Sequence, residues 1–159
     1  MRVSEGGHRR AAVLTLTVIA ILTLATVAAP EAMAGYRGRV LRIVNATREN
    51  QGLHLVSIDR SLSRKAMRHT RKMLRENAIF DPSNLSQLMS GEPWNTIAGS
   101  VAGCGSTLRR VHRAFLHDAV HRAILLNPDM RRIGIGAVKA TSANACGRGS
   151  FWTTELLYG

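Results

Sequence analysis

The chain has 159 residues, a net charge of about +12 at pH 7 and two cysteines, and 4% of its residues are aromatic. A charge this positive predicts anionic surroundings, such as a wall polymer, lipid headgroups or nucleic acid, but it does not choose among them. The scarcity of aromatic side chains argues against a stacking platform for single-stranded nucleic acid. We therefore do not expect specific nucleic-acid binding.

Residues 1–34 have the pattern of a secretory signal peptide. A basic start that includes Arg9 and Arg10 precedes the uncharged segment 11–29, and Ala32-Met33-Ala34 is typical of a cleavage site. We predict a secreted, extracellular protein with domain 35–159. The alternative is a membrane anchor through 11–29, because 19 uncharged residues approach the roughly 20 that span a bilayer. The threonines in this segment and Pro30 favour cleavage.

The remaining 125 residues are enough for one compact domain. Its two cysteines, Cys104 and Cys146, are predicted to form a disulfide, because thiols pair outside the cytoplasm. Two separate buried thiols are the alternative. A metal site built on these cysteines is less favoured, since the chain has no Cys-x-x-Cys pair.

The first two helices are predicted from apolar spacing. After a glycine-containing lead at 35–39, a helix begins near Val40 and ends near Gly52. A short extended connection follows, and Asp59 or Ser61 caps a second helix over 61–77. One side of that helix is predicted to pack inward, through Leu62, Ala66, His69, Thr70 and Met73.

The opposite side of the second helix is basic. Its cations are Arg60, Arg64, Lys65, Arg68, Arg71, Lys72 and Arg75. Such a row is either a solvated helix face or a docking surface for an anionic polymer or membrane.

The rest of the chain combines a loop, a third helix and a hairpin. Turn-forming residues predict a long loop over 80–99, with at most one short helix. The glycine-rich segment 99–105 around Cys104 is also expected to be a loop, but it lacks the lysine of a phosphate-binding loop. Ser106 or Thr107 caps a helix over 108–118, with Val111, Ala114 and Phe115 inward and Arg109, Arg110 and Arg113 outward. Alternation predicts strands over 133–138 and 152–158, so the chain ends in a hairpin whose loop Cys146 ties to Cys104.

Several stretches resemble the bacterial branch of the CAP superfamily, which comprises cysteine-rich secretory proteins, antigen 5 and group-one pathogenesis-related proteins, also called SCP-like extracellular proteins. The most specific are Val111-His112-Arg113-Ala114-Phe115-Leu116, His121-Arg122-Ala123-Ile124-Leu125 and Arg132-Ile133-Gly134-Ile135-Gly136. The final segment Trp152-Thr153-Thr154 through Tyr158-Gly159 is also similar. The resemblance spans the whole mature chain, and it implies an α+β fold, an α-β-α sandwich with a small antiparallel sheet between helices.

Members of this family often gather two histidines and two glutamates in a cleft, and the resemblance implies that this cleft is degenerate here. His121 matches one histidine, whereas Asp81 or Pro82 stands where the other is expected. Ser100 occupies the position of a glutamate and cannot supply a carboxylate, and Asp118 falls near the position of the second glutamate.

No catalytic residue or resident cofactor is predicted. The candidate ligands for a weakly bound divalent metal are His121, His117 and Asp118, with Asp81 as a further candidate. Structural roles for these histidines are favoured, because no glutamate follows His117 as in the metalloprotease motif.

Two functional hypotheses remain. We favour a secreted, non-enzymatic binding module for a cell-wall polymer, a lipid or another anionic extracellular partner, with the basic face of the second helix as the surface contact. The degenerate cleft is then either vestigial or a site for a small apolar ligand. The alternative is a metal-dependent hydrolase or nuclease that acts on an anionic polymer through His121, Asp118 and Asp81. The sequence does not predict an oligomeric state.

Overall fold

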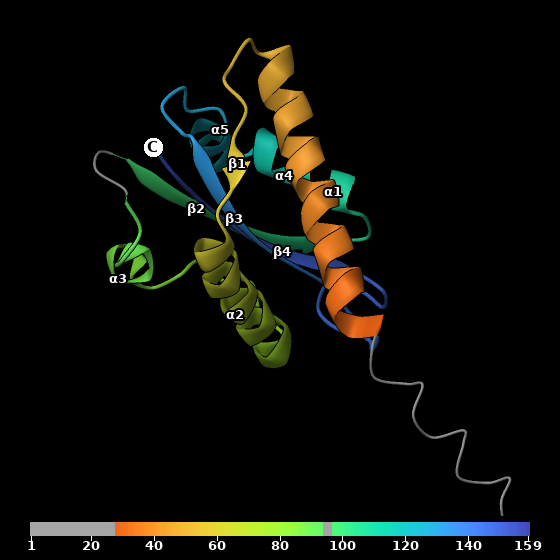
Figure 1. Cartoon of the computed structure of the whole chain (residues 1–159). Helices are drawn as coiled ribbons and strands as arrows, with labels where there is room; N and C mark the ends of the chain where they lie inside the picture. The colour runs from red at the N-terminus through yellow and green to blue at the C-terminus, as the bar shows by residue number, and fades with distance from the viewer. Residues whose placement is uncertain (1–27, 94–96) are drawn as a thin grey trace, which may run out of the picture.

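The computed structural model of this chain describes residues 28–93 and 97–159, where five helices surround a four-stranded sheet (Figure 1). The helices are α1 (Ala28–Asn50), α2 (Arg60–Glu76), α3 (Leu85–Met89), α4 (Leu108–His117) and α5 (Ala119–Leu125). The strands are β1 (Ser57–Ile58), β2 (Ala98–Gly105), β3 (Arg132–Lys139) and β4 (Phe151–Tyr158), in the order β1-β3-β4-β2. All neighbouring strands are antiparallel except β1, which pairs parallel with β3.

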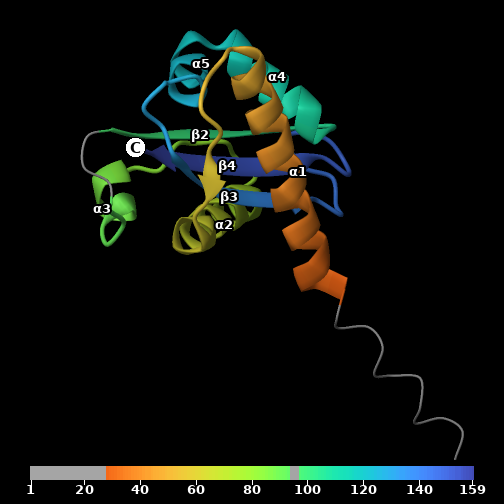
Figure 2. The same cartoon turned by 45° about the horizontal axis from the view of Figure 1, so that its top comes forward.

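Helices cover both faces of this sheet (Figure 2). Alternate residues of β4 point to opposite faces, so Trp152 and Leu156 pack in the clusters beneath α2 and α3, while Leu157 packs with α1, α4 and α5. The sheet therefore lies between two helical layers, which confirms the predicted α-β-α sandwich.

The second helix begins and ends where local capping predicts. The Asp59 carboxylate accepts a hydrogen bond from the Leu62 backbone amide at 2.9 Å, and Asn77 ends α2 in the left-handed conformation with φ of 52°. Leu62, Ala66 and Met73 are fully buried, so the predicted inward side of α2 is confirmed.

Two glycines of β3 set how closely α2 approaches the sheet. A Cβ added at Gly134 would lie 2.5 Å from the backbone carbon of Leu62, and one at Gly136 would lie 2.5 Å from that of Ala66. Any side chain there would push α2 off the sheet. Within the Ile-Gly-Ile-Gly sequence, the two glycines thus contact α2, and Ile133 and Ile135 enter the core on the opposite face of the sheet.

The disulfide between Cys104 and Cys146 joins the end of β2 to the β3–β4 connection, as predicted. Their Cα atoms lie 6.1 Å apart. Strands β3 and β4 form the predicted antiparallel hairpin, with Gly136 opposite Thr154 in its register.

Three expectations about individual segments were wrong. The glycine-rich stretch expected to be loop is strand β2, which pairs with β4 along its whole length. Residues 35–39, expected to be a lead, belong to helix α1. Ala114, expected to point inward, is exposed, because the buried side of α4 is centred on Val111 and Phe115.

Arg48 holds the end of α1 to two distant segments. Its guanidinium is fully buried and donates to the carbonyls of His54, Leu125, Asn127 and Met130, at 2.7 to 3.2 Å. Burial, together with the charge of Arg131, lowers the pKa of Arg48 from its ordinary value. In the described part of the chain, its hydrogen bonds all go to backbone carbonyls.

Within 28–93 and 97–159, no helix has the length and apolar character needed to cross a membrane. Most of the predicted signal lies outside the described residues. The predicted cleavage point after Ala34 falls within α1.

Candidate functional site

A groove of about 1100 Å³ runs along the surface between α1 and α4. Its apolar lining comes from Leu41, Ile43, Ala46, Leu55, Leu108, Leu116 and Phe151. Its charged lining consists of four arginines, Arg39, Arg42, Arg109 and Arg113, and one acid, Glu49. We call this site the α1–α4 groove.

Helix periodicity places these arginines. Val40 and Val44 of α1 pack in the same core cluster as Val111 and Phe115 of α4, so one side of each helix faces the sheet. Arg42 and Arg113 fall on the opposite sides of their helices and are exposed. The groove therefore carries net positive charge beside an apolar surface.

One polar contact crosses the groove. The Thr47 hydroxyl lies 2.8 Å from His112 Nε2 and donates to the Ile43 carbonyl at 3.1 Å. The Thr47 hydroxyl thus contacts both the Ile43 carbonyl and His112 Nε2, and the tautomer of the ring sets which of Thr47 and Nε2 donates. His112 Nδ1 is buried and has no hydrogen-bond partner among the described residues.

His112 is uncharged at neutral pH. It is only 6% exposed, and burial lowers its pKa to about 4. The positive charge of the groove therefore comes from its arginines, which surround a neutral imidazole.

Two residues predicted for the degenerate cleft lie together. Asp118 accepts a hydrogen bond from the His121 backbone amide at 2.9 Å and so caps α5, and its carboxylate lies 3.5 Å from His121 Nδ1. That backbone hydrogen bond lowers the pKa of Asp118. The His121 ring packs edge-on against Phe115, and His117 is exposed at the end of α4.

The other two predicted cleft residues lie on the opposite side of the sheet. Ser100 pairs with Leu156 in the register of β2 and β4, so it points toward α2 and α3. Asp81 follows α2, where burial lowers the pKa of His69 and the charge of Asp81 partly raises it. The structure thus joins Asp118 with His121 and separates both from Ser100 and Asp81.

The described residues contain no group of three or more His, Cys, Asp or Glu side chains arranged to hold a metal ion. His69, the histidine of α2, instead contacts the Thr154 hydroxyl at 3.1 Å, which ties α2 to β4. Its ring also packs edge-on against Phe80.

The predicted basic face of α2 is exposed to solvent. We define the α2 basic face as Arg60, Arg64, Arg68, Arg71, Lys72 and Arg75. Lys65 does not belong to it, because its ammonium pairs with Glu92 at 2.7 Å and is largely buried.

A family model described as the cysteine-rich secretory protein family, CAP, matches residues 41–155. The chain belongs to the CAP family. The YkwD protein of Bacillus subtilis is 30% identical to this CAP domain over an alignment of 142 residues that covers 85% of this chain and 52% of that protein. The CAP chain described here therefore spans about half the length of that curated relative.

Solved structures show the same fold. An outer surface protein of Borrelia burgdorferi superposes with a TM-score of 0.64 at 19% identity, over 77% of this CAP chain and 90% of that protein. An extracellular protein of Bacillus anthracis that contains an SCP domain superposes with a TM-score of 0.60 at 19% identity, over 82% of this chain and 42% of that protein. Identities this low establish the CAP fold alone.

The α1–α4 groove was not predicted as a site. Helix periodicity placed Arg109, Arg110 and Arg113 outward, but nothing in the sequence indicated that α1 would lie beside them. His112 and Thr47 stand 65 positions apart, and only the packing of the two helices brings them together.

Proposed function

We propose that this CAP domain is a non-enzymatic extracellular binding module that takes an anionic amphiphile in the α1–α4 groove. The observation that carries the proposal is the combination of an apolar lining with four arginines and a single acid. An anionic headgroup is the natural partner of guanidinium groups, and an acyl chain is the natural partner of the apolar lining.

The energetics favour a ligand with both parts. Each methylene removed from water contributes about 0.8 kcal/mol, so a chain that buries four of them gains about 3 kcal/mol. Exposed arginines add little by themselves, but several of them around one phosphate bind it cooperatively in a partly dry groove. Neither part of the groove would hold a small polar or neutral ligand tightly.

The Thr47–His112 pair in the groove lacks the third group that orients the base beside a nucleophile. His112 Nδ1, where such a group would bind, has no hydrogen-bond partner among the described residues, and the Thr47 hydroxyl also contacts the Ile43 carbonyl at 3.1 Å. With a pKa of about 4, His112 is also a weak proton acceptor. This geometry supports binding in preference to catalysis.

The placement of similar proteins agrees with an extracellular role. One structural neighbour is an outer surface protein, and another is an extracellular protein. We propose the same location for this chain, in keeping with its signal-like residues 1–34.

The test uses two lysophospholipids with the same lauroyl chain, one with an anionic glycerol headgroup and one with a zwitterionic choline headgroup. Calorimetry below the micelle concentration should show tighter binding of the anionic lipid. The double variant Arg42→Glu/Arg113→Glu should lose about 30-fold or more of that affinity, since each cation lost near an anion costs about 1 kcal/mol and reversal adds repulsion.

Two further variants control the result. Arg122→Glu/Arg148→Glu has the same net charge but changes exposed residues outside the groove lining, so it should bind like the wild type. Ala46→Trp fills the groove without changing its charge and should weaken both lipids. Equal binding of the two headgroups, or equal affinity of the groove and control variants, would overturn the proposal.

A further inference from the structure

The α2 basic face is a straight row of cations on one side of a rigid helix. Arg60, Arg64, Arg68, Arg71 and Arg75 recur every three or four residues, with Lys72 beside Arg71, over the 17 residues of α2, a length of roughly 25 Å. Leu62, Ala66 and Met73 fix the opposite side of the helix in the core. The row is therefore presented outward as a unit.

Little acidic charge offsets this row. Glu76 is the only acid of α2, and its carboxylate lies 4.0 Å from Lys72 with both side chains about half exposed. A contact this long and this exposed neutralises little charge. Arg64, Arg68 and Arg75 are exposed and have no acidic partner in the described part of the chain.

A second basic face lies on the other helical layer. We define the α1–α4 basic face as Arg39, Arg42, Arg109, Arg110 and Arg113, all of which are exposed. Figure 2 shows α4 and α5 on one side of the sheet and α2 on the other, and the α1 core residues share the cluster of α4. The two basic faces therefore point away from each other, and one flat surface cannot contact both.

We infer that this domain bridges two anionic lipid bilayers, one held by the α2 basic face and the other by the α1–α4 basic face. This inference goes beyond the groove proposal, because it needs no ligand chain inside the groove. A bilayer fits the α2 row because its anionic headgroups form a continuous plane that the exposed Arg64, Arg68 and Arg75 meet together. The other face adds apolar contact to its charge, since Leu55 lines the groove and is 55% exposed.

The experiment uses vesicles of equal parts phosphatidylglycerol and phosphatidylcholine with the full chain. Cosedimentation measures binding, and turbidity measures vesicle aggregation. The wild type should bind and aggregate the vesicles. Aggregation should vanish near 1 M salt, where the screening length falls to about 3 Å.

Charge reversal separates the two faces. Arg64→Glu/Arg68→Glu/Arg75→Glu changes the α2 face, and Arg42→Glu/Arg109→Glu/Arg113→Glu changes the other. Each triple variant should bind through its intact face but lose aggregation at least tenfold. In the combined variant each face has lost three cations. Because each cation near an anionic leaflet contributes about fivefold, binding through either face should fall about 100-fold or more. All variants carry residues 1–34, so the combined variant also reports any membrane contact made by that segment.

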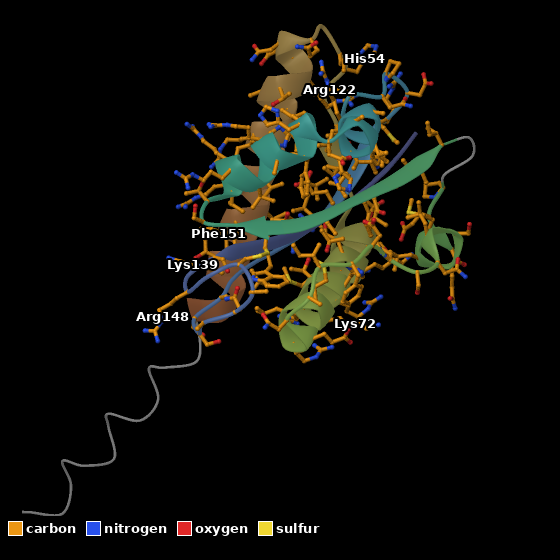
Figure 3. All side chains as sticks on the ribbon, turned by 180° about the vertical axis from the view of Figure 1, so that it is seen from behind. His54, Lys72, Arg122, Lys139, Arg148 and Phe151 are labelled. Atoms are coloured by element: carbon orange, nitrogen blue, oxygen red, sulfur yellow. A yellow bond between two sulfur atoms is a disulfide. The ribbon has the colours of Figure 1, made fainter. Side chains whose placement is uncertain are left out.

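A charge-matched control is available on parts of the surface away from both rows. Figure 3 shows Arg122 at the opposite end of the molecule from Lys72 of α2, with Arg148 at a separate corner near one end of the sheet. Lys139 is not used in the control, because its ammonium lies 5.7 Å from the centre of the Phe151 ring, which lines the groove. Arg122→Glu/Arg131→Glu/Arg148→Glu changes three exposed arginines that belong to neither face, and it should aggregate vesicles as the wild type does.

Several results would overturn the inference. The inference is wrong if the wild type binds vesicles without aggregating them, if either single-face variant aggregates vesicles as well as the wild type, or if the combined variant still aggregates them. It is also wrong if soluble polyphosphate precipitates the protein but vesicles do not aggregate with it. Failure here is distinguishable from failure of the groove proposal. The α2 variant should bind the soluble lysophospholipid normally, whereas Ala46→Trp should still aggregate vesicles.

Discussion

A buried carboxyl group on β4 should make the stability of this domain fall as the pH rises. Glu155 is 1% exposed and lies between Val101 of β2 and Ile135 of β3 in the sheet register. Its Oε2 atom has no hydrogen-bond partner among the described residues. Burial raises the pKa of Glu155 to about 8.

The direction follows from which state holds the proton. Above pH 4.5 the unfolded chain releases the Glu155 proton, while the folded protein keeps it until about pH 8. The folded state therefore binds more protons between these values, so the free energy of unfolding falls by about 1.4 kcal/mol per pH unit. Across the whole window this amounts to about 5 kcal/mol.

His112 contributes with the opposite sign at lower pH. Its pKa is about 4 in the folded protein and 6.5 ordinarily, so its contribution to stability increases as the pH rises from 4 to 6.5. The two slopes nearly cancel below pH 6.5. Wild-type stability should then fall by about 2 kcal/mol between pH 6.5 and 8.

The variant Glu155→Gln isolates the carboxyl group, because glutamine has nearly the same shape and does not titrate. Urea denaturation at half-unit steps from pH 4.5 to 8.5 gives the difference in unfolding free energy between variant and wild type. That difference should shift in favour of the variant by about 1.4 kcal/mol per pH unit and level off above pH 8. A difference that stays constant with pH would refute a protonated, buried Glu155.

Four other perturbations have defined outcomes. Replacing both Cys104 and Cys146 by alanine should cost about 4 kcal/mol of unfolding free energy, as expected for releasing a loop of 42 residues, measured by denaturation of the disulfide-bonded wild type and of the variant. Gly136→Ala should cost about 2 kcal/mol or more, since its methyl group meets the α2 backbone, whereas Gly147→Ala, in open space but at a φ of 89°, should cost about 1 kcal/mol. Arg48→Met should cost about 3 kcal/mol or more because four carbonyls lose their donor, and Arg48→Lys should restore only part of this loss. Dialysis against zinc should leave no stoichiometric metal, and tight zinc that His121→Ala abolishes would instead favour the metal-dependent alternative.

Local signals predicted α2 and α4 closely, but they missed α5 and the early start of α1, and they predicted the strands less completely. Asp59 and Thr107 lie at the starts of α2 and α4 as capping side chains, and such signals need only neighbouring residues. Strand β2 was missed because glycines weaken its strand pattern, although Gly99 and Gly103 are small to make room for Ile124 and Phe115. Those partners are more than ten residues away along the chain.

The candidate site was predictable only in its parts. The outward arginines of α4 followed from helix periodicity, and the basic side of α2 did as well. The groove depends on α1 lying beside α4, which is a tertiary contact without a local signal. The burial of Glu155 could not be predicted from the sequence either. Its strand has polar residues on both faces, so alternation does not indicate which face the core covers.

The guanidinium of Arg48 has a consequence for the order in which the chain assembles. Its hydrogen-bond acceptors in the second half of the domain stand 77, 79 and 82 positions later in the sequence. A chain delivered amino end first through a pore would therefore present α1 long before residues 125–130 emerge. Until they arrive, desolvating this cation would leave most of its donors unsatisfied, so we expect α1 to dock only after the carboxyl-terminal half has appeared.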